Sequence, residues 1–227
     1  MRVALVTVGD ELLAGDTVNT NAAWLGRQLA ERGVSLERVT VLPDRIADIA
    51  RAVDEQRAAF DAVIVTGGLG PTHDDRTMEA VAAAFDRGLA EDDRVFDWLA
   101  SEGYAAEDLA DGTASIPAGS DPIRNPEGVA PGCVIGNVYV LPGVPAEMEA
   151  MFEEIAGAFT GESRYVRTLE AAEPESALVD RLVEVEDRFG VTVGSYPGED
   201  VRVKISGTDE AAVAAAAEWL RERVDAP

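Results

Sequence analysis

Apolar and polar residues follow a regular order along the N-terminal part of the chain. Continuous apolar runs at residues 3–8 and 62–65, and the spaced apolar positions within 36–41, are typical of buried β-strands. Between them, apolar residues three and four apart predict a helix over residues 21–32 and another from Pro43-Asp44 onwards. Strands that alternate with helices predict an α/β fold with a mainly parallel central sheet.

The pattern changes after residue 130. Apolar runs at 133–136 and 138–141 flank Gly136-Asn137, which predicts a β-hairpin, and a helix is expected to begin at Pro145. The stretch between residues 80 and 118 is alanine-rich and acidic, carries no motif, and is interpreted as scaffold.

The C-terminal part predicts a second, smaller unit. Residues 157–163 have the composition of a linker. The expected strands and helices beyond it fall at residues 165–169, 177–189, 191–195, 201–206 and 210–224. We therefore predict a domain of residues 1–160 and a small α+β unit of residues 161–227.

A glycine-rich segment is the strongest candidate for chemistry. Thr66-Gly67-Gly68-Leu69-Gly70-Pro71-Thr72-His73-Asp74-Asp75 follows the apolar run at 62–65 and precedes a helix expected from Arg76. Glycines let the backbone approach a phosphate, the following helix presents its N–H groups, and adjacent carboxylates can hold a divalent cation. The alternative is an ordinary tight turn closed by an aspartate that caps the helix.

Two other polar segments are expected at the same place. In parallel sheets a ligand lies beyond the carboxyl ends of the strands. Those ends carry Gly9 to Glu11, Pro43-Asp44 and the glycine-rich segment. The sequence therefore predicts that three candidate motifs meet at one edge of the sheet.

Several ordered blocks resemble one protein family. Besides the glycine-rich segment with Thr77, they are Gly9-Asp10-Glu11-Leu12-Leu13 with Gly15 and Asn19-Thr20-Asn21, Asn125-Pro126-Glu127-Gly128 with Ala130-Pro131-Gly132, and Leu141-Pro142-Gly143-Val144-Pro145 with Glu147. Together they resemble molybdopterin-binding-fold proteins, in the branch of the N-terminal domain of competence/damage-inducible protein A (CinA). Glu175-Ser176-Ala177-Leu178 and Gly194-Ser195-Tyr196-Pro197 resemble the distal part of that family more weakly.

The resemblance implies a three-layer molybdopterin-binding-like fold and a metal-dependent hydrolase of nucleotide diphosphates, with an ADP-ribose pyrophosphatase as the best single expectation. One alternative is a nucleotidyltransferase of molybdopterin or flavin metabolism, since the same loop and metal serve both reactions. Another is a module that binds a pterin or nucleotide without turnover, because the deamidase domain of longer CinA proteins has no counterpart here. Family members generally assemble through this domain, so a homo-oligomer is expected.

The resemblance also assigns site residues. Asp44 and Asp75 are the expected catalytic carboxylates, and Asp74 and Asp75 are expected to share a divalent ion, Mg, Mn or Co. The residues expected to bind substrate are Gly9, Glu11, Asn19, Asn21, Thr66, Gly67, Gly68, Gly70, Pro71, Thr72, Pro142 and Gly143. Capping is the alternative for Asp44 and for both asparagines, and a proline-led helix start is the alternative for the turn at 142–143.

The charge balance of the chain limits the classes of ligand and partner that the protein is expected to bind. There are 43 acidic against 19 basic residues, a net charge of -24, and Lys204 is the only lysine. Such a surface repels polyanions, so nucleic-acid binding is disfavoured. The small-molecule nucleotide or pterin that the family resemblance implies remains the expected ligand. The excess of acidic residues also predicts a halophilic, high-salt cytoplasm, where screening removes much of the self-repulsion.

The single cysteine, the single histidine and the lengths of the apolar runs exclude further classes of site and location. Cys133 is the only cysteine, which excludes an internal disulfide and predicts a buried side chain. His73 is the only histidine and is interpreted as a bystander. No apolar run reaches membrane-spanning length and residues 1–8 resemble a core strand rather than a signal peptide, so a cytoplasmic location without membrane contact is expected.

Overall fold

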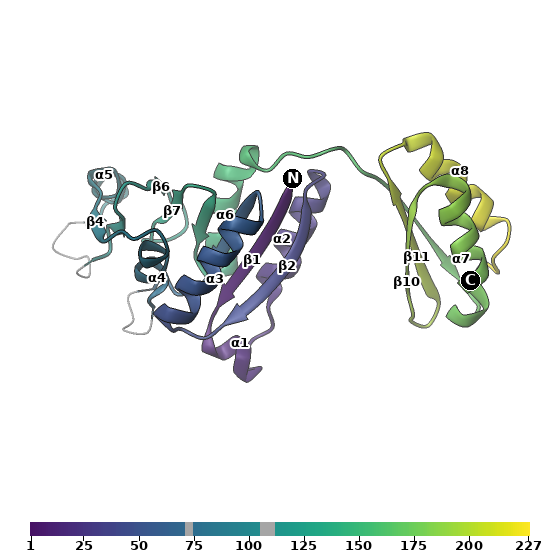
Figure 1. The fold of residues 1–227 in the computed structure, drawn as a ribbon, viewed down its shortest axis with the longest axis horizontal. Helices are drawn as coiled ribbons and strands as arrows, with labels where there is room; N and C mark the ends of the chain where they lie inside the picture. The colour runs from purple at the N-terminus through teal and green to yellow at the C-terminus, as the bar shows by residue number, and fades with distance from the viewer. Residues whose placement is uncertain (71–74, 105–111) are drawn as a thin grey trace. The chain divides into compact units, whose positions relative to one another are not determined.

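The computed structural model describes residues 1–70, 75–104 and 112–227. These residues divide into two compact units. The first comprises Met1–Ala30 and Val34–Gly161, and the second comprises Glu31–Gly33 and Glu162–Pro227. Figure 1 draws the two units with the helices and strands labelled.

The first unit is built on a six-stranded sheet in the order β2-β1-β3-β8-β7-β6. Its strands are β1 (Arg2–Val8), β2 (Ser35–Leu42), β3 (Ala62–Thr66), β6 (Asp121–Ile123), β7 (Gly132–Ile135) and β8 (Val138–Leu141). β1 runs parallel to β2 and β3, and β3 runs parallel to β8, whereas β7 is antiparallel to β6 and β8. The predicted α/β fold with a mainly parallel sheet is confirmed.

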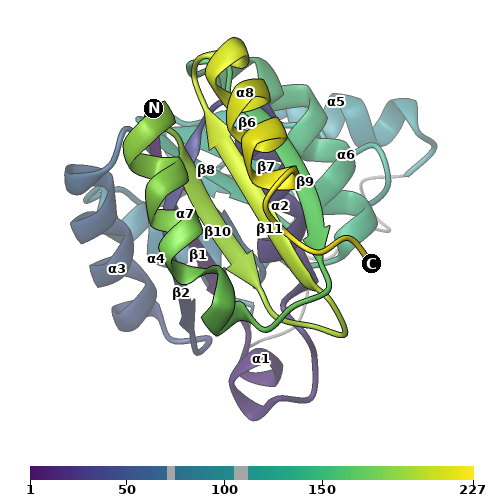
Figure 2. The same ribbon diagram turned by 90° about the vertical axis from the view of Figure 1, so that its right-hand side faces the viewer.

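Helices cover both faces of this sheet because its strands are apolar on both faces. On one face α2 (Thr20–Glu31) and α6 (Pro145–Ile155) pack with Leu5, Ile64 and Phe152 in one apolar core. On the other face α3 (Ile46–Ala59) and α4 (Thr77–Ala84) pack with Val6 and Val65 in a second core. Figure 2 shows α3 and α6 on opposite sides of the sheet, which is the three-layer arrangement that the sequence predicts.

The acidic stretch interpreted as scaffold forms a small subdomain beside α4. It contains β4 (Leu89–Glu91), which pairs antiparallel with β5 (Ser115–Pro117), and α5 (Asp93–Ser101). Asp92 caps α5 by accepting a hydrogen bond from the Arg94 N–H at 2.9 Å. This subdomain supplies one wall of a cavity described below.

The second unit packs two helices against one face of a three-stranded antiparallel sheet (Figure 1). The sheet order is β10-β11-β9, with β9 at Tyr165–Ala171, β10 at Thr192–Tyr196 and β11 at Val201–Gly207. The helices are α7 (Glu175–Phe189) and α8 (Glu210–Arg221), and Leu178, Ile205 and Trp219 belong to their shared apolar core.

Some element boundaries differ from the sequence expectations. Residues 10–14 form a short helix, α1 (Asp10–Ala14), where only a motif was expected. Helix α3 begins at Ile46 with Arg45 as its N-cap, so Asp44 is not the cap of that helix. The hairpin at Gly136-Asn137 is present, with Gly136 in the left-handed region at a φ of 58°. The 3₁₀ turn η2 (Ala156–Ala158) extends α6 into the expected linker.

Cys133 is buried in the sheet, as expected. Burial raises the pKa of its thiol to about 12, so the thiol stays protonated at neutral pH and is a poor nucleophile. Within the described residues, no helix combines the length and the apolar character needed to cross a membrane.

The charge pattern predicts a salt dependence of stability. The net charge of -24 produces self-repulsion that dissolved ions screen, whereas ion pairs such as Arg2–Glu37 are exposed and contribute little. We expect the thermal midpoint to rise as potassium chloride increases from low to molar concentration. A thermal unfolding series in KCl tests this, and a flat or falling midpoint would contradict it.

Candidate functional site

The site is built where four parallel strands end. Gly9 follows β1, Asp44 follows β2, Gly67 follows β3 and Pro142 follows β8. Backbone hydrogen bonds hold these ends together, from the Gly9 N–H to the Leu42 carbonyl at 3.1 Å and from the Gly67 N–H to the Leu141 carbonyl at 3.2 Å. The parallel register therefore brings segments distant in sequence to one edge.

One cleft of about 510 Å³ contains most of the predicted site residues. We call it the acidic cleft because four carboxylate side chains, those of Glu11, Asp44, Asp75 and Glu147, line it. Its other lining residues among those predicted are Gly9, Gly67, Gly68, Gly70, Pro142 and Gly143. The expectation that the three polar segments meet at one edge agrees with this geometry.

The glycine-rich turn has a backbone that other residues rarely adopt. Gly67 and Gly68 have φ values of 94° and 66°, in the left-handed region. A Cβ atom at Gly67 would lie 2.2 Å from the carbonyl oxygen of Val8, and one at Gly68 would lie 2.4 Å from Thr77 Oγ1. Glycine is therefore required at both positions by backbone conformation and by space.

The Asp44 side chain forms a hydrogen bond with the segment that follows β1, rather than capping the helix α3 that follows it in sequence. Its Oδ2 accepts a hydrogen bond from the Asp10 N–H at 3.0 Å, so it satisfies a donor at the start of α1. Burial raises the pKa of the Asp44 carboxyl, the Asp10 N–H opposes that rise, and the charges of Asp10, Glu11 and Asp75 add to it. Negative charge is thus crowded at this edge.

This crowding predicts a stabilising substitution. Because the pKa of the Asp44 carboxyl is raised in the folded protein, folding favours the protonated form. The contribution of this protonated carboxyl to stability is fully present below the unfolded pKa, about 3.9. It is lost as the pH rises through the folded pKa. Asparagine still accepts the Asp10 N–H but carries no charge. Asp44→Asn should therefore raise the thermal midpoint by about 1–3 °C at pH 7, with a smaller rise at pH 4.

Thermal unfolding of wild type and Asp44→Asn at the two pH values measures this difference. Asp97→Asn is the matched control, because Asp97 is an exposed carboxylate on α5 outside the acidic cleft. An Asp44→Asn midpoint that is lower than wild type at pH 7 would show that the charge of Asp44 stabilises the fold.

Asp75 lies on the opposite side of the turn. The N-cap of α4 is Arg76, so Asp75 precedes the capping position, contrary to the capping alternative. A Cβ atom at Gly70 would lie 2.7 Å from Asp75 Oδ2. Gly70 thus leaves the space in which the Asp75 carboxylate sits.

Replacing Gly70 tests that relationship. Gly70 is not in the left-handed region, so valine can be accommodated by the backbone. The side chain must displace the Asp75 carboxylate, and we expect Gly70→Val to weaken nucleotide binding about 10-fold with the fold intact, which corresponds to about 1.4 kcal/mol. Calorimetry with ADP and circular dichroism on the same sample measure both, and unchanged affinity would remove this loop from the site.

The two asparagines differ in role. Asn19 Oδ1 accepts the Ala22 N–H at 3.0 Å and so caps α2, while its Nδ2 donates to Thr7 Oγ1 at 3.0 Å. Asn21 Nδ2 donates to the Gly143 carbonyl at 2.7 Å, which ties α2 to the turn after β8. With Thr66 they line a smaller cavity of about 90 Å³ next to Gly67. Capping is therefore the observed role of Asn19.

Part of the predicted site, namely Pro71, Thr72 and Asp74, lies outside the described residues, as does the bystander His73. The expected metal pair of Asp74 and Asp75 is therefore not placed as a pair. Among the residues that the structure places, no group of three or more histidine, cysteine or acidic side chains is arranged to hold a metal ion. Any cation held by these residues needs further ligands from elsewhere.

Sequence reasoning missed several residues that line the acidic cleft or lie next to the glycine-rich turn. Glu147 in α6 accepts a hydrogen bond from Asn125 Nδ2 at 2.7 Å, which joins two of the resembling blocks. Thr77 is fully buried, and among the described residues its Oγ1 has no hydrogen-bond partner. Val129 and Ala130 line the acidic cleft and a second cavity beside it. The blocks that contain Glu147 and Ala130 were the available signal.

Comparison with known families divides the chain at the same place as the structure. Residues 4–160 match the family described as probable molybdopterin binding domain. Residues 163–226 match the family described as FAD synthase, middle domain. The second match gives the C-terminal unit a relationship that its sequence pattern alone did not indicate.

Individual relatives extend the same relationship. A protein of Archaeoglobus fulgidus is 38% identical over 98% of this chain and 97% of its own length. A CinA-like protein of Chlorobaculum tepidum is 36% identical over 91% of this chain, which spans 54% of that protein. The crystal structure of the protein CinA from Thermoplasma acidophilum matches 70% of this chain and 97% of its own, at 38% identity and a TM-score of 0.65. The chain therefore belongs to the family of probable molybdopterin binding domains, in its CinA-like branch.

Proposed function

We propose that the acidic cleft binds a nucleoside diphosphate derivative and hydrolyses its phosphoanhydride bond, with ADP-ribose as the leading substrate. One observation carries the proposal: Asp44 and Asp75 flank the glycine-rich turn. A Cβ atom at Gly68 would lie 3.2 Å from Asp44 Oδ1, and one at Gly70 would lie 2.7 Å from Asp75 Oδ2. A phosphate that approaches these glycines therefore meets a carboxylate on each side.

Phosphate binding is supported by backbone groups rather than by basic side chains. Neither lysine nor arginine lines the acidic cleft within the described residues. The turn between Gly67 and Gly70 leads toward the N-terminus of α4, and such termini present N–H groups to anions. Thr77 at the start of that helix adds a buried hydroxyl next to Gly68.

A divalent cation fits the donor set if it arrives with the substrate. Asp44 and Asp75 supply two carboxylates, and magnesium is commonly held by one or two carboxylates together with substrate phosphates. The crowded negative charge at Asp44 supports a cation there. When bound, the ion neutralises charge on the diphosphate and lowers the pKa of the attacking water.

The reaction that we propose consumes one water. The water oxygen forms a bond to one phosphorus while the bond from that phosphorus to the bridging oxygen breaks. ADP-ribose then yields AMP and ribose 5-phosphate, and the proton of the water passes to Asp44 Oδ1 and on to solvent. Carboxylates can act as general bases, and burial raises the pKa of Asp44 above its ordinary value when no cation is bound.

Release of AMP tests the proposal. The protein is incubated at high salt with ADP-ribose, FAD or NAD, each with magnesium, manganese or cobalt, and AMP is quantified against a metal-free control. We expect metal-dependent AMP release that is fastest from ADP-ribose. Binding without any AMP release would overturn hydrolysis and favour a module that holds its nucleotide or pterin without turnover.

Nucleotidyl transfer is a second candidate. It is favoured by the match of residues 163–226 to the middle domain of FAD synthase. Transfer replaces water by a phosphate of the acceptor and needs the same loop and cation. Incubation of ATP with FMN or with molybdopterin, followed by detection of the adenylylated product, distinguishes transfer from hydrolysis.

A further inference from the structure

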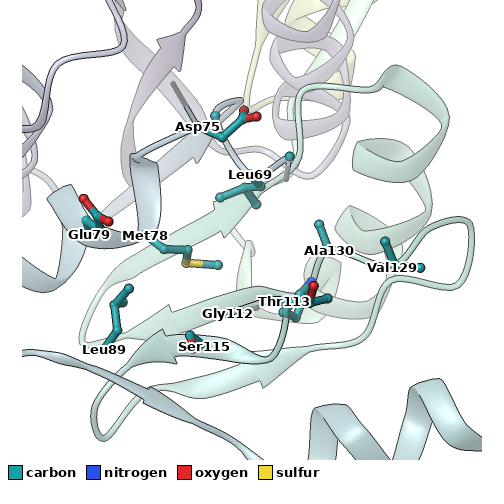
Figure 3. Close-up of a pocket in the computed structure, with 13 residues that line it drawn as sticks. Leu69, Asp75, Met78, Glu79, Leu89, Gly112, Thr113, Ser115, Val129 and Ala130 are labelled. Atoms are coloured by element: carbon teal, nitrogen blue, oxygen red, sulfur yellow. The ribbon is translucent and has the colours of Figure 1, made fainter. Parts of the chain in front are cut away.

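A second cavity adjoins the acidic cleft on the other side of the glycine-rich turn. It measures about 260 Å³ and lies between this turn, α4 and the subdomain of β4 and β5. We call it the apolar pocket. Figure 3 shows its lining, in which the apolar side chains are Leu69, Met78, Leu89, Val129, Ala130 and Pro131.

The two cavities share lining residues but differ in the number of carboxylates. Both are lined by Gly68, Leu69, Gly70 and Asp75, so a ligand held at the turn can extend into either. The acidic cleft has four carboxylates, whereas the apolar pocket has Asp75 at the shared turn and Glu79. In Figure 3 the Glu79 carboxylate lies at the edge, away from Leu69, and it pairs with Arg76 at 3.1 Å.

We infer that the apolar pocket is the subsite for the flat ring system of the ligand, while its diphosphate lies at the glycine-rich turn beside the acidic cleft. The inference rests on the proposed function. Ligand pockets usually measure about 300–1,000 Å³, so a pocket of about 260 Å³ suits one part of a ligand. Six of the lining residues are apolar and can contact the faces of a neutral ring.

Met78 is the side chain best placed to contact such a ring. Figure 3 shows it extending from α4 into the space between Leu69 and Ser115. Its sulfur lies 3.7 Å from Cys133 Sγ, which anchors the thioether to the sheet beneath. Thioethers make favourable contacts with aromatic rings. The hydroxyls of Thr113 and Ser115 supply polar groups at the opposite wall.

The test compares two probes that differ only in the ring-bearing part. The probes are α,β-methylene-ADP and methylenediphosphonate, whose P–C–P bonds cannot be hydrolysed, each titrated with magnesium by calorimetry. Leu89→Ala removes an apolar wall of the apolar pocket, and Val39→Ala on β2, outside both cavities, is its matched control. Leu89 is 40% exposed and Val39 is 47% exposed, so neither substitution opens the core.

We expect Leu89→Ala to weaken α,β-methylene-ADP about 3–10-fold and to leave methylenediphosphonate within twofold. Val39→Ala should leave both affinities within twofold. Ser115→Phe places a large side chain from β5 in the apolar pocket. It should bring the affinity for α,β-methylene-ADP close to that for methylenediphosphonate.

Three results would overturn the inference. They are an unchanged affinity of Leu89→Ala for the nucleotide analogue, equal losses for both probes, and an equally large nucleotide-specific loss in Val39→Ala. Because these probes report binding without turnover, failure of AMP release from ADP-ribose would overturn the proposed hydrolysis and leave the placement of the ring intact.

Discussion

Asp75→Asn is expected to lower AMP release from ADP-ribose by about 10²-fold or more while the thermal midpoint stays near that of wild type. The loss follows if Asp75 helps to hold a cation that supplies several kcal/mol of transition-state stabilisation. Stability is retained because asparagine keeps the size of aspartate and an oxygen that accepts hydrogen bonds, and because the N-cap of α4 is Arg76 rather than Asp75. Turnover at saturating metal and thermal unfolding are measured on one sample.

The control is Asp97→Asn, which removes an exposed carboxylate of α5 that lies away from the acidic cleft. Its activity should stay within twofold of wild type. Full activity in Asp75→Asn with an unchanged midpoint would remove Asp75 from the catalytic set. A lowered midpoint with retained activity would assign it a structural role.

Gly67→Ala is expected to cause the largest loss of stability. Gly67 has a φ of 94°, and an added Cβ would lie 2.2 Å from the Val8 carbonyl oxygen, a backbone atom that cannot rotate away. The ends of β1 and β3 would have to separate. We expect the free energy of unfolding to fall by about 3 kcal/mol or more, which lowers the thermal midpoint by roughly 6–12 °C.

Gly15→Ala separates the effect of left-handed backbone strain from the effect of the steric clash with Val8. Gly15 is also left-handed, at a φ of 79°, but nothing lies within 4 Å of an added Cβ. It should cost only the backbone strain, about 1–2 kcal/mol. If both alanine variants lost the same stability in thermal unfolding, the close contact of Gly67 with Val8 would play no part.

The sequence predicted the strands, helices and turns whose signals lie in neighbouring residues. The apolar runs at β1 and β3, the helical spacing of α2 and α3, and the turn at Gly136-Asn137 need only neighbouring residues to be recognised. The predicted ends of these elements were less exact than their predicted presence. Asp44 looked like the start of α3 because proline and aspartate commonly begin helices, yet its side chain bonds to α1.

The identity of the glycine-rich segment as a strand–turn–helix junction was also determined by the sequence alone. Three glycines between an apolar run and a helical pattern permit few other backbones, and Gly67 and Gly68 adopt the left-handed conformations that glycine allows. The meeting of three polar segments at one edge followed from the rule for parallel strands.

Only the tertiary structure decided which side chains share a cavity. The bond between Asn21 and the Gly143 carbonyl spans 122 residues, and the raised pKa of Asp44 depends on burial and on Asp75 as well as on nearby charges. The apolar pocket combines α4 with residues near 89 and 112–115, whose own patterns showed no motif, and with residues 129–131 beside and within one of the resembling blocks. Burial and charge at such sites arise from contacts between distant segments, so no local periodicity encodes them.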